Sequence, residues 1–329
     1  MTDKGSWLVF GRIVGAHLPT KPVKIGNALL GPMPYEGTPL ERTSGKITLS
    51  SPELDSCFYS YTDMQLISNC LFWIISVEDT SEAAIEAVRT RDLPLLQTAL
   101  SVRRPQGPYL LQVLWAEKDG QRRGSPVKSN FGIWTKSEMS QDAIERARID
   151  FTALAGDEKA LQAARHFSEA IMQSATATTP LHEEAVLLSL FKVIEGMSRM
   201  VPASNPQEYE TAQLEVIDRL QASLQLSAPL EYKTEALHSA NRDLKRLKGH
   251  YLSLRIAAMA TLLRLPDGWR RAADEFISFR NRRLGHSGPS TTSADRTRWL
   301  DWNLEYPAWT LARTLLAAYA DHKALKAIE

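Results

Sequence analysis

The sequence predicts an α+β N-terminal domain followed by an all-α antiparallel helical bundle. Two observations lead to this fold class. In the first 137 residues, short apolar runs alternate with Gly, Pro and Ser clusters, which is typical of strands joined by turns. From residue 140 onward, apolar residues instead recur at the three- and four-residue spacing of amphipathic helices. Because 329 residues also suggest two domains, we expect one at residues 1–137 and another at residues 138–329.

In the first region, the apolar runs predict strands at residues 7–14, 23–30, 47–49 and 71–77. Two short helices should follow, one capped by Ser81 and one that begins near Asp92 and Pro94.

A hairpin is expected next, with strands at residues 109–116 and 131–135. Its polar connection holds the turn signal Asp119-Gly120 and the basic residues Arg122, Arg123 and Lys128.

Capping residues mark the first three helices of the second region. Ser140 precedes a helix that Gly156 ends, Asp157 precedes the next, and Thr179-Pro180 opens the third. The apolar stripes of the second and third helices are Leu161, Ala164, Phe167 and Ile171, and Leu187, Leu190, Phe191, Ile194 and Met197. More polar helices at 208–224 and 231–247, and apolar ones at 251–263, around Trp269 and at 308–328, would complete a bundle.

Charge is unevenly distributed along the chain. The net charge is +1, yet residues 242–300 hold thirteen Lys or Arg and only five Asp or Glu. This local excess favours a polyanionic partner, although solvated helix faces would give the same count.

Three further observations bear on the cellular compartment. Cys57 and Cys70 lack metal-site spacing, and we expect both to be reduced thiols. There is no signal-like N-terminus and no apolar run of about 18 residues. We expect a soluble cytoplasmic protein that does not enter a membrane.

The stretch at residues 269–289, WRRAADEFISFRNRRLGHSGP, carries the main functional signal. One helix face would hold Trp269, Ala273, Phe276, Arg280 and Arg283. Arg280 thus occupies an apolar position, where its charge needs an anion, a hydrogen-bond network or a partner chain. Gly285 and Pro289 should end the helix and leave His286 exposed.

RNRRLGH, at residues 280–286, resembles the R-x(4 to 6)-H motif of HEPN domains, with Asn281 in the polar position that follows the Arg. LLSLFKVIEG, in the earlier helix at residues 187–196, is similar to the Apea-like branch of that superfamily. The resemblance covers residues 157–329. Arg12 and His17 have the same spacing, but they lie in a strand-like region and we interpret that match as chance.

The resemblance implies an HEPN-like bundle and a metal-independent endoribonuclease that acts as a homodimer. Its products would carry a 2′,3′-cyclic phosphate and a 5′-hydroxyl. Arg280, Asn281 and His286 would be catalytic, and Arg270, Arg271, Arg282 and Arg283 would bind the RNA backbone. No cofactor and no metal is expected. The family suggests a regulated prokaryotic defence or toxin effector, in which residues 1–137 sense an unknown trigger or inhibitor, or recognise the substrate.

Alternative interpretations remain open. The bundle could be a non-catalytic HEPN module that binds nucleotide, nucleic acid or a protein, or an unrelated helical domain whose RNRR run stabilises a helix end. His182, Glu183 and Glu184 could hold a metal, but acidic residues also suit a first helical turn. We expect His166 to be structural, His238 and His250 to flank a solvated basic segment, and Trp299, Trp302 and Trp309 to be core or interface aromatics.

Overall fold

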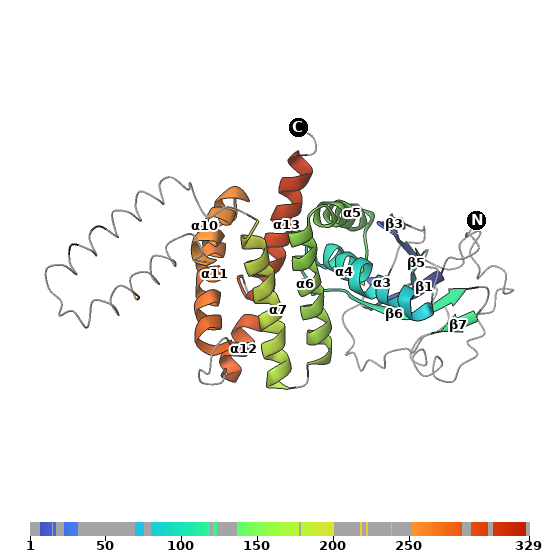
Figure 1. Cartoon of the computed structure of the whole chain (residues 1–329), viewed down its shortest axis with the longest axis horizontal. Helices are drawn as coiled ribbons and strands as arrows, with labels where there is room; N and C mark the ends of the chain where they lie inside the picture. Colours follow the sequence, from blue (N-terminus) through green and yellow to red (C-terminus); the bar gives the residue numbers. More distant parts are fainter. Residues whose placement is uncertain are drawn as a thin grey trace.

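The computed structural model describes residues 7–14, 16–17, 23–31, 70–75, 80–118, 121–123, 137–177, 179–200, 218, 222, 238, 252–284, 291–301 and 305–326. The N-terminal part of the chain combines strands with two short helices, the C-terminal part is helical, and the two parts lie side by side (Figure 1). The expected combination of an α+β region and a helical region is therefore present.

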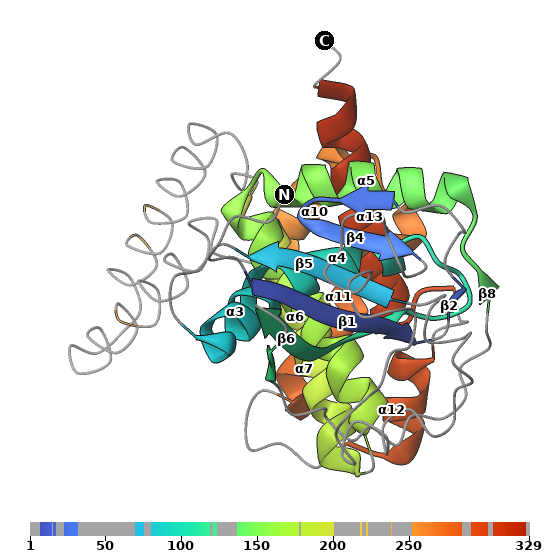
Figure 2. The same ribbon diagram turned by 90° about the vertical axis from the view of Figure 1, so that its right-hand side faces the viewer.

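A six-stranded antiparallel sheet forms the N-terminal part, with β1 between β5 and β6 (Figure 2). Its order is β3 (Val23–Ile25), β4 (Ala28–Gly31), β5 (Cys70–Ile75), β1 (Trp7–Val14), β6 (Leu110–Lys118) and β7 (Gln121–Arg123). A separate parallel pair joins β2 (Ala16–His17) to β8 (Ser137–Glu138).

The strand register places one continuous apolar face against the helices. Val9 lies opposite Trp73 of β5 and Ala116 of β6, and all three side chains are fully buried. Gly11, the next β1 residue on that face, leaves room for the Trp73 ring, since a Cβ there would lie 3.0 Å from the ring and 2.6 Å from the Gln112 carbonyl oxygen.

Two of the strand predictions are corrected by the structure. Residues 23–30 form two strands, because Gly26 (φ +57°) and Asn27 make a two-residue turn between β3 and β4. Arg122 and Arg123 lie in β7, which pairs directly with β6, rather than in a long polar connection. The expected strands at 47–49 and 131–135 lie outside the described residues.

Helices α3 (Ser81–Ala87), α4 (Leu93–Ser101) and α5 (Gln141–Ala155) pack on the apolar face of the sheet. Thr80 caps α3 by accepting a hydrogen bond from the Ala83 backbone N–H, so Ser81 is the first helical residue and not the cap. A π-helical turn, η2 (Val88–Asp92), joins α3 to α4 without a break. Ser140 caps α5, as expected.

The C-terminal part is a bundle in which α6 (Glu158–Thr176) and α7 (Pro180–Ser198) pair as a hairpin. Asp157 and Thr179 cap these two helices, which confirms both predictions. The other members are α10 (Leu252–Leu262), α11 (Asp267–Phe279), the π-helical turn η3 (Arg280–Leu284), α12 (Ser293–Leu300) and α13 (Ala308–Lys326). Helix α12 is absent from the elements predicted above.

The two apolar cores meet at α4 and α5. Ile144 of α5 belongs to the core under the sheet, whereas Leu154 of the same helix and Leu95 of α4 belong to the core of the bundle. Gln97 of α4 bridges the two layers, since its Oε1 accepts from the Leu111 N–H of β6 and its Nε2 donates to the Ser168 carbonyl of α6. The domain boundary near residue 137 stays a prediction, and α5 beyond it packs on both cores.

No helix in the described part of the chain is long and apolar enough to cross a membrane.

Candidate active site

Helix α11 leads directly into the motif and is anchored by its apolar face. Trp269, Ala273 and Phe276 are fully buried, and the Trp269 indole N–H donates to the Leu311 carbonyl of α13 at 3.0 Å. After Phe279 the chain continues as the π-helical turn η3. Such single turns are frequently found at functional sites.

Arg280 is the first residue of this turn, and its side chain lies on α7. The guanidinium stands over the Phe191 ring, 4.7 Å from the ring centroid. Its Nη1 donates to Asn281 Oδ1 at 3.1 Å, while its Nε is enclosed and lacks a hydrogen-bond partner among the described residues. Among the described residues, no carboxylate pairs with the Arg280 guanidinium. The guanidinium is therefore a half-buried cation with a neutral partner, which is the electrostatic setting of an anion site.

Asn281 is exposed and touches Arg280 through the hydrogen bond just described. An amide oxygen that accepts from one guanidinium nitrogen restricts the orientation of the whole planar group. The structure thus brings together two of the three predicted catalytic residues. His286, with Gly285 and Pro289, falls in residues 285–290, outside the described residues.

The Phe191 ring that contacts Arg280 belongs to a cluster of aromatic rings. The Phe191 ring packs against Phe276 at a centroid distance of 6.2 Å, and Phe276 contacts Trp299 of α12 at 4.9 Å. Phe279 completes the cluster, 5.7 Å from Trp299. Sequence reasoning placed Phe191 correctly on an apolar stripe but could not reveal that Arg280 stacks on it, since that contact joins residues 89 positions apart.

The four predicted backbone-binding arginines divide between two places. Arg282 is exposed and donates from Nε to the Ser278 carbonyl, and it lines a hollow beside α12 together with Arg283. Arg270 and Arg271 are exposed near the start of α11, and Arg271 lines a neighbouring hollow. Arg270 interacts instead with Asp274, whose pKa is raised by burial and partly lowered again by Arg270.

Arg298 of α12 is a basic residue of this region that was not among the predicted site residues. It lines both hollows, stands over the Trp299 ring at 5.1 Å, and contacts Glu275 of α11 at 2.8 Å. The capping box of α12, in which Thr292 and Asp295 bond each other reciprocally, was a visible signal for the helix that carries it.

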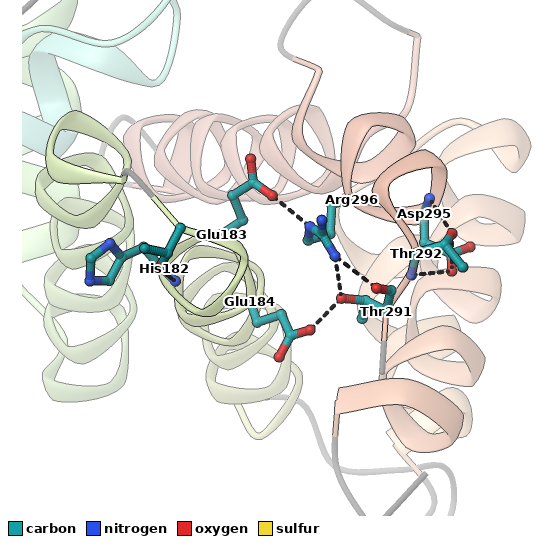
Figure 3. A network of polar contacts seen from close by, with 8 residues as sticks. His182, Glu183, Glu184, Thr291, Thr292, Asp295 and Arg296 are labelled. Atoms are coloured by element: carbon teal, nitrogen blue, oxygen red, sulfur yellow. Dashed lines mark hydrogen bonds and ion pairs between the residues drawn. The ribbon is translucent and has the colours of Figure 1, made fainter. Parts of the chain in front are cut away.

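Glu183 and Glu184, considered above as metal ligands, instead tie α7 to the segment that begins α12 (Figure 3). Arg296 Nε donates to Glu183 Oε2 at 2.6 Å, and its Nη1 donates to the Thr291 carbonyl at 2.7 Å. The Thr291 hydroxyl donates to Glu184. Within the described ranges, no group of three or more His, Cys, Asp or Glu is arranged to hold a metal.

The remaining candidates are the other histidines and tryptophans named from the sequence, and the spurious match at Arg12. His166 lies between Gln162 and Glu169 on α6, with ring nitrogens 3.3 Å from each side chain. Trp299 and Trp309 are 4% and 3% exposed and belong to the bundle core, as expected. His238 is helical and exposed, and Arg12 donates to Gln112. His250 and Trp302 lie outside the described residues.

Comparisons with models of known protein families, with curated proteins and with solved structures give no match. The resemblance to HEPN domains therefore rests on the residues of the chain itself.

Proposed function

We propose that this chain is an HEPN-type, metal-independent endoribonuclease, with Arg280, Asn281 and His286 as its catalytic residues. The observation that carries the proposal is the state of Arg280. Its guanidinium is half buried over Phe191, and among the described residues its Nε is enclosed without a partner and its one side-chain hydrogen bond goes to a neutral amide. A phosphate would supply the missing negative charge and the acceptor oxygens, in the two-pronged geometry that guanidinium favours.

The proposed reaction is a transesterification within RNA. A base, which we assign to His286, removes the proton from a ribose 2′-hydroxyl, and the resulting oxygen forms a bond to the adjacent phosphorus. The bond from phosphorus to the 5′-oxygen of the next nucleotide breaks, and that oxygen takes up a proton. The products are a 2′,3′-cyclic phosphate and a 5′-hydroxyl. A histidine suits both proton transfers because its unperturbed pKa, about 6.5, lies near neutral pH.

Arg280 and Asn281 have separate tasks in this scheme. Negative charge accumulates on the phosphoryl oxygens as the new bond forms, and a fixed guanidinium stabilises that charge without having to reorganise. Asn281 holds the guanidinium plane through its Oδ1. DNA would resist cleavage because it lacks the attacking hydroxyl.

The wider assignment follows the same proposal. Arg270, Arg271, Arg282 and Arg283 would contact the RNA backbone, and two copies of the chain would join their motifs in one cleft. Residues 1–137 would bind a trigger or inhibitor, and the chain would act in a cytoplasmic defence or toxin system. A non-catalytic HEPN module is the second candidate, because an Arg280–Asn281 anion site would equally bind a nucleotide or nucleic acid without cutting it.

The deciding experiment is cleavage of mixed cellular RNA by the purified chain in EDTA, compared with Arg280→Ala and His286→Ala. Arg148→Ala is a matched control, since Arg148 is an exposed arginine of α5 paired with Glu145. We expect the parent and the control to cut, leaving cyclic phosphate ends, and both motif variants to lose activity by at least about 100-fold. An inert parent, or motif variants as active as the control, would contradict catalysis at this site.

A further inference from the structure

A hollow of about 670 Å³ lies between the second half of α11 and α12. Phe279 and Trp299, which belong to the aromatic cluster under Arg280, form its apolar wall. Arg282, Arg283 and Arg298 supply its positive charges. Phe191, the ring that contacts Arg280, is linked to this wall through Phe276, so one aromatic cluster lies between the two places.

The hollow lies on a different side of α11 from Arg280. Arg271, Glu275, Ser278 and Arg282 recur at spacings of four, three and four residues, and they line this hollow or the adjoining one. That exposed stripe is opposite the buried stripe that begins with Trp269 and ends at Arg280. A strand of nucleic acid that reaches Arg280 and passes around the end of α11 would therefore meet these arginines next.

Two acidic residues also line the hollow, and each has a partner already. Asp295 accepts from the backbone N–H and the hydroxyl of Thr292 as part of the cap of α12. Those bonds, with smaller contributions from Arg283 and Arg298, lower the pKa of Asp295 and keep it a carboxylate. Glu275 contacts Arg298 at 2.8 Å, with side chains 49% and 64% exposed. Arg282 and Arg283 form no ion pair with a carboxylate in the described ranges.

We infer that this hollow binds a second phosphodiester of a single-stranded RNA substrate through Arg282, Arg283 and Arg298, and that Glu275 competes with that phosphate for Arg298. The inference rests on the proposed function, since it places a further phosphate of the strand whose cleaved phosphate lies at Arg280. An exposed ion pair is weak, so exchanging the Glu275 carboxylate for a phosphate is feasible. Glu275 then competes with the phosphate for Arg298 and lowers the affinity of the hollow for any nucleic-acid backbone.

The test uses binding rather than cleavage. A fluorescently labelled single-stranded oligodeoxynucleotide presents the phosphates but lacks the 2′-hydroxyl, so the proposed nuclease cannot cut it. Affinity is measured by fluorescence anisotropy at several salt concentrations for the parent, Glu275→Gln, Arg298→Ala, and the control Arg148→Ala. Thermal unfolding of each variant checks that it is folded.

Opposite signs are expected for the two substitutions. Glu275→Gln should tighten binding by about two- to fivefold, the range that an exposed ion pair covers. Arg298→Ala should weaken it and reduce the slope of log affinity against log salt by about one, as loss of a single phosphate contact does. Arg148→Ala should leave both quantities unchanged. Because Glu275→Gln keeps the shape of an exposed side chain, it remains interpretable even if Arg298→Ala fails to fold.

The inference and the proposed function can fail separately. If the parent cuts RNA but Glu275→Gln does not tighten binding of the oligodeoxynucleotide, the hollow is not a phosphate site and the nuclease stands. If Glu275→Gln tightens binding while the parent leaves RNA intact, the hollow binds nucleic acid and the catalytic proposal falls. A parent that does not bind the oligodeoxynucleotide overturns the inference.

Discussion

Arg103 donates two hydrogen bonds to Asp150, from Nε to Oδ2 and from Nη2 to Oδ1, each 2.8 Å long. The Asp150 side chain, on α5, is only 1% exposed. The same guanidinium also bonds Asp321 of α13, whose side chain is 49% exposed. Arg103 follows α4, so this one side chain connects a helix of the sheet layer to the last helix of the bundle.

The two carboxylates should differ sharply in their contribution to stability. Asp150→Ala should lower the free energy of unfolding by about 2 kcal/mol, because it removes two hydrogen bonds between charged groups at a buried position while Arg103 keeps its pair with Asp321. Asp321→Ala should lower it by less than about 1 kcal/mol, because that pair is solvated. Urea denaturation of both variants measures the difference. Equal losses would mean that burial of Asp150 does not govern the strength of its contact.

The turn between β3 and β4 should tolerate no side chain at Gly26. This residue has φ +57°, and a Cβ there would lie 2.3 Å from the Phe151 ring of α5. Gly26→Ala should therefore cost about 2 kcal/mol from the left-handed backbone alone, and more if Phe151 cannot move. Thermal or urea unfolding gives the value.

Gly156 provides a matched control for this substitution. It ends α5 with φ −78°, and an added Cβ would make only ordinary contacts, the nearest at 3.6 Å. Gly156→Ala should be neutral or should stabilise by up to about 1 kcal/mol, since alanine restricts the unfolded chain. A comparable loss in both variants would contradict the argument from backbone conformation.

Local signals in the sequence were sufficient for much of the helical region. Ser140, Asp157 and Thr179 were recognised as caps because a cap bonds backbone groups two or three residues away. Gly26-Asn27 and the Thr292–Asp295 capping box were equally local, and both could have been recognised. The π-helical turn at Arg280–Leu284 could not, since nothing in RNRRL distinguishes it from an ordinary last turn.

The candidate site shows the same limit. An arginine on an apolar stripe is visible in the sequence, and Arg280 does lie against the aromatic cluster. What lies next to it depends on tertiary packing. Phe191 is on α7, and Arg298 is on a helix that was not expected, so neither contact could be derived from spacing within one helix.

Tyr319 of α13 should destabilise the fold at alkaline pH. Its side chain is 5% exposed, and its hydroxyl is enclosed without a hydrogen-bond partner among the described residues. Burial, assisted by Asp157, raises the pKa of Tyr319 to about 12. The neutral phenol is thus favoured in the folded chain. The contribution of neutral Tyr319 to the free energy of unfolding is complete below the unfolded pKa of about 10, and it is lost as the pH rises through 12.

Tyr319→Phe tests this assignment. At pH 7 the variant should be more stable by about 1 kcal/mol, because no buried hydroxyl is left unpaired. Its advantage over the parent should grow between pH 9 and pH 12, and the other tyrosines cancel in the comparison. Urea unfolding at three pH values measures it. A constant difference would mean that Tyr319 titrates normally in the folded chain.

Arg280→Met separates a functional arginine from a structural one. Methionine keeps the reach of the side chain and its contact with the Phe191 ring, while it removes the charge and the enclosed Nε. If Arg280 is held in readiness for a phosphate, the variant should unfold at the same free energy as the parent or up to about 1 kcal/mol higher, because the cost of half-burying a cation without a counter-charge offsets its contacts with Phe191 and Asn281.

Arg103→Met is the matched control, because it makes the same chemical change at an arginine whose partners are all in place. It should lose about 3 kcal/mol or more, since it leaves Asp150 buried and unpaired. Urea denaturation of both variants, together with RNA cleavage by Arg280→Met, gives the comparison. A loss at Arg280 as large as that at Arg103 would make Arg280 a structural residue, and the need for an anion at this site would disappear with it.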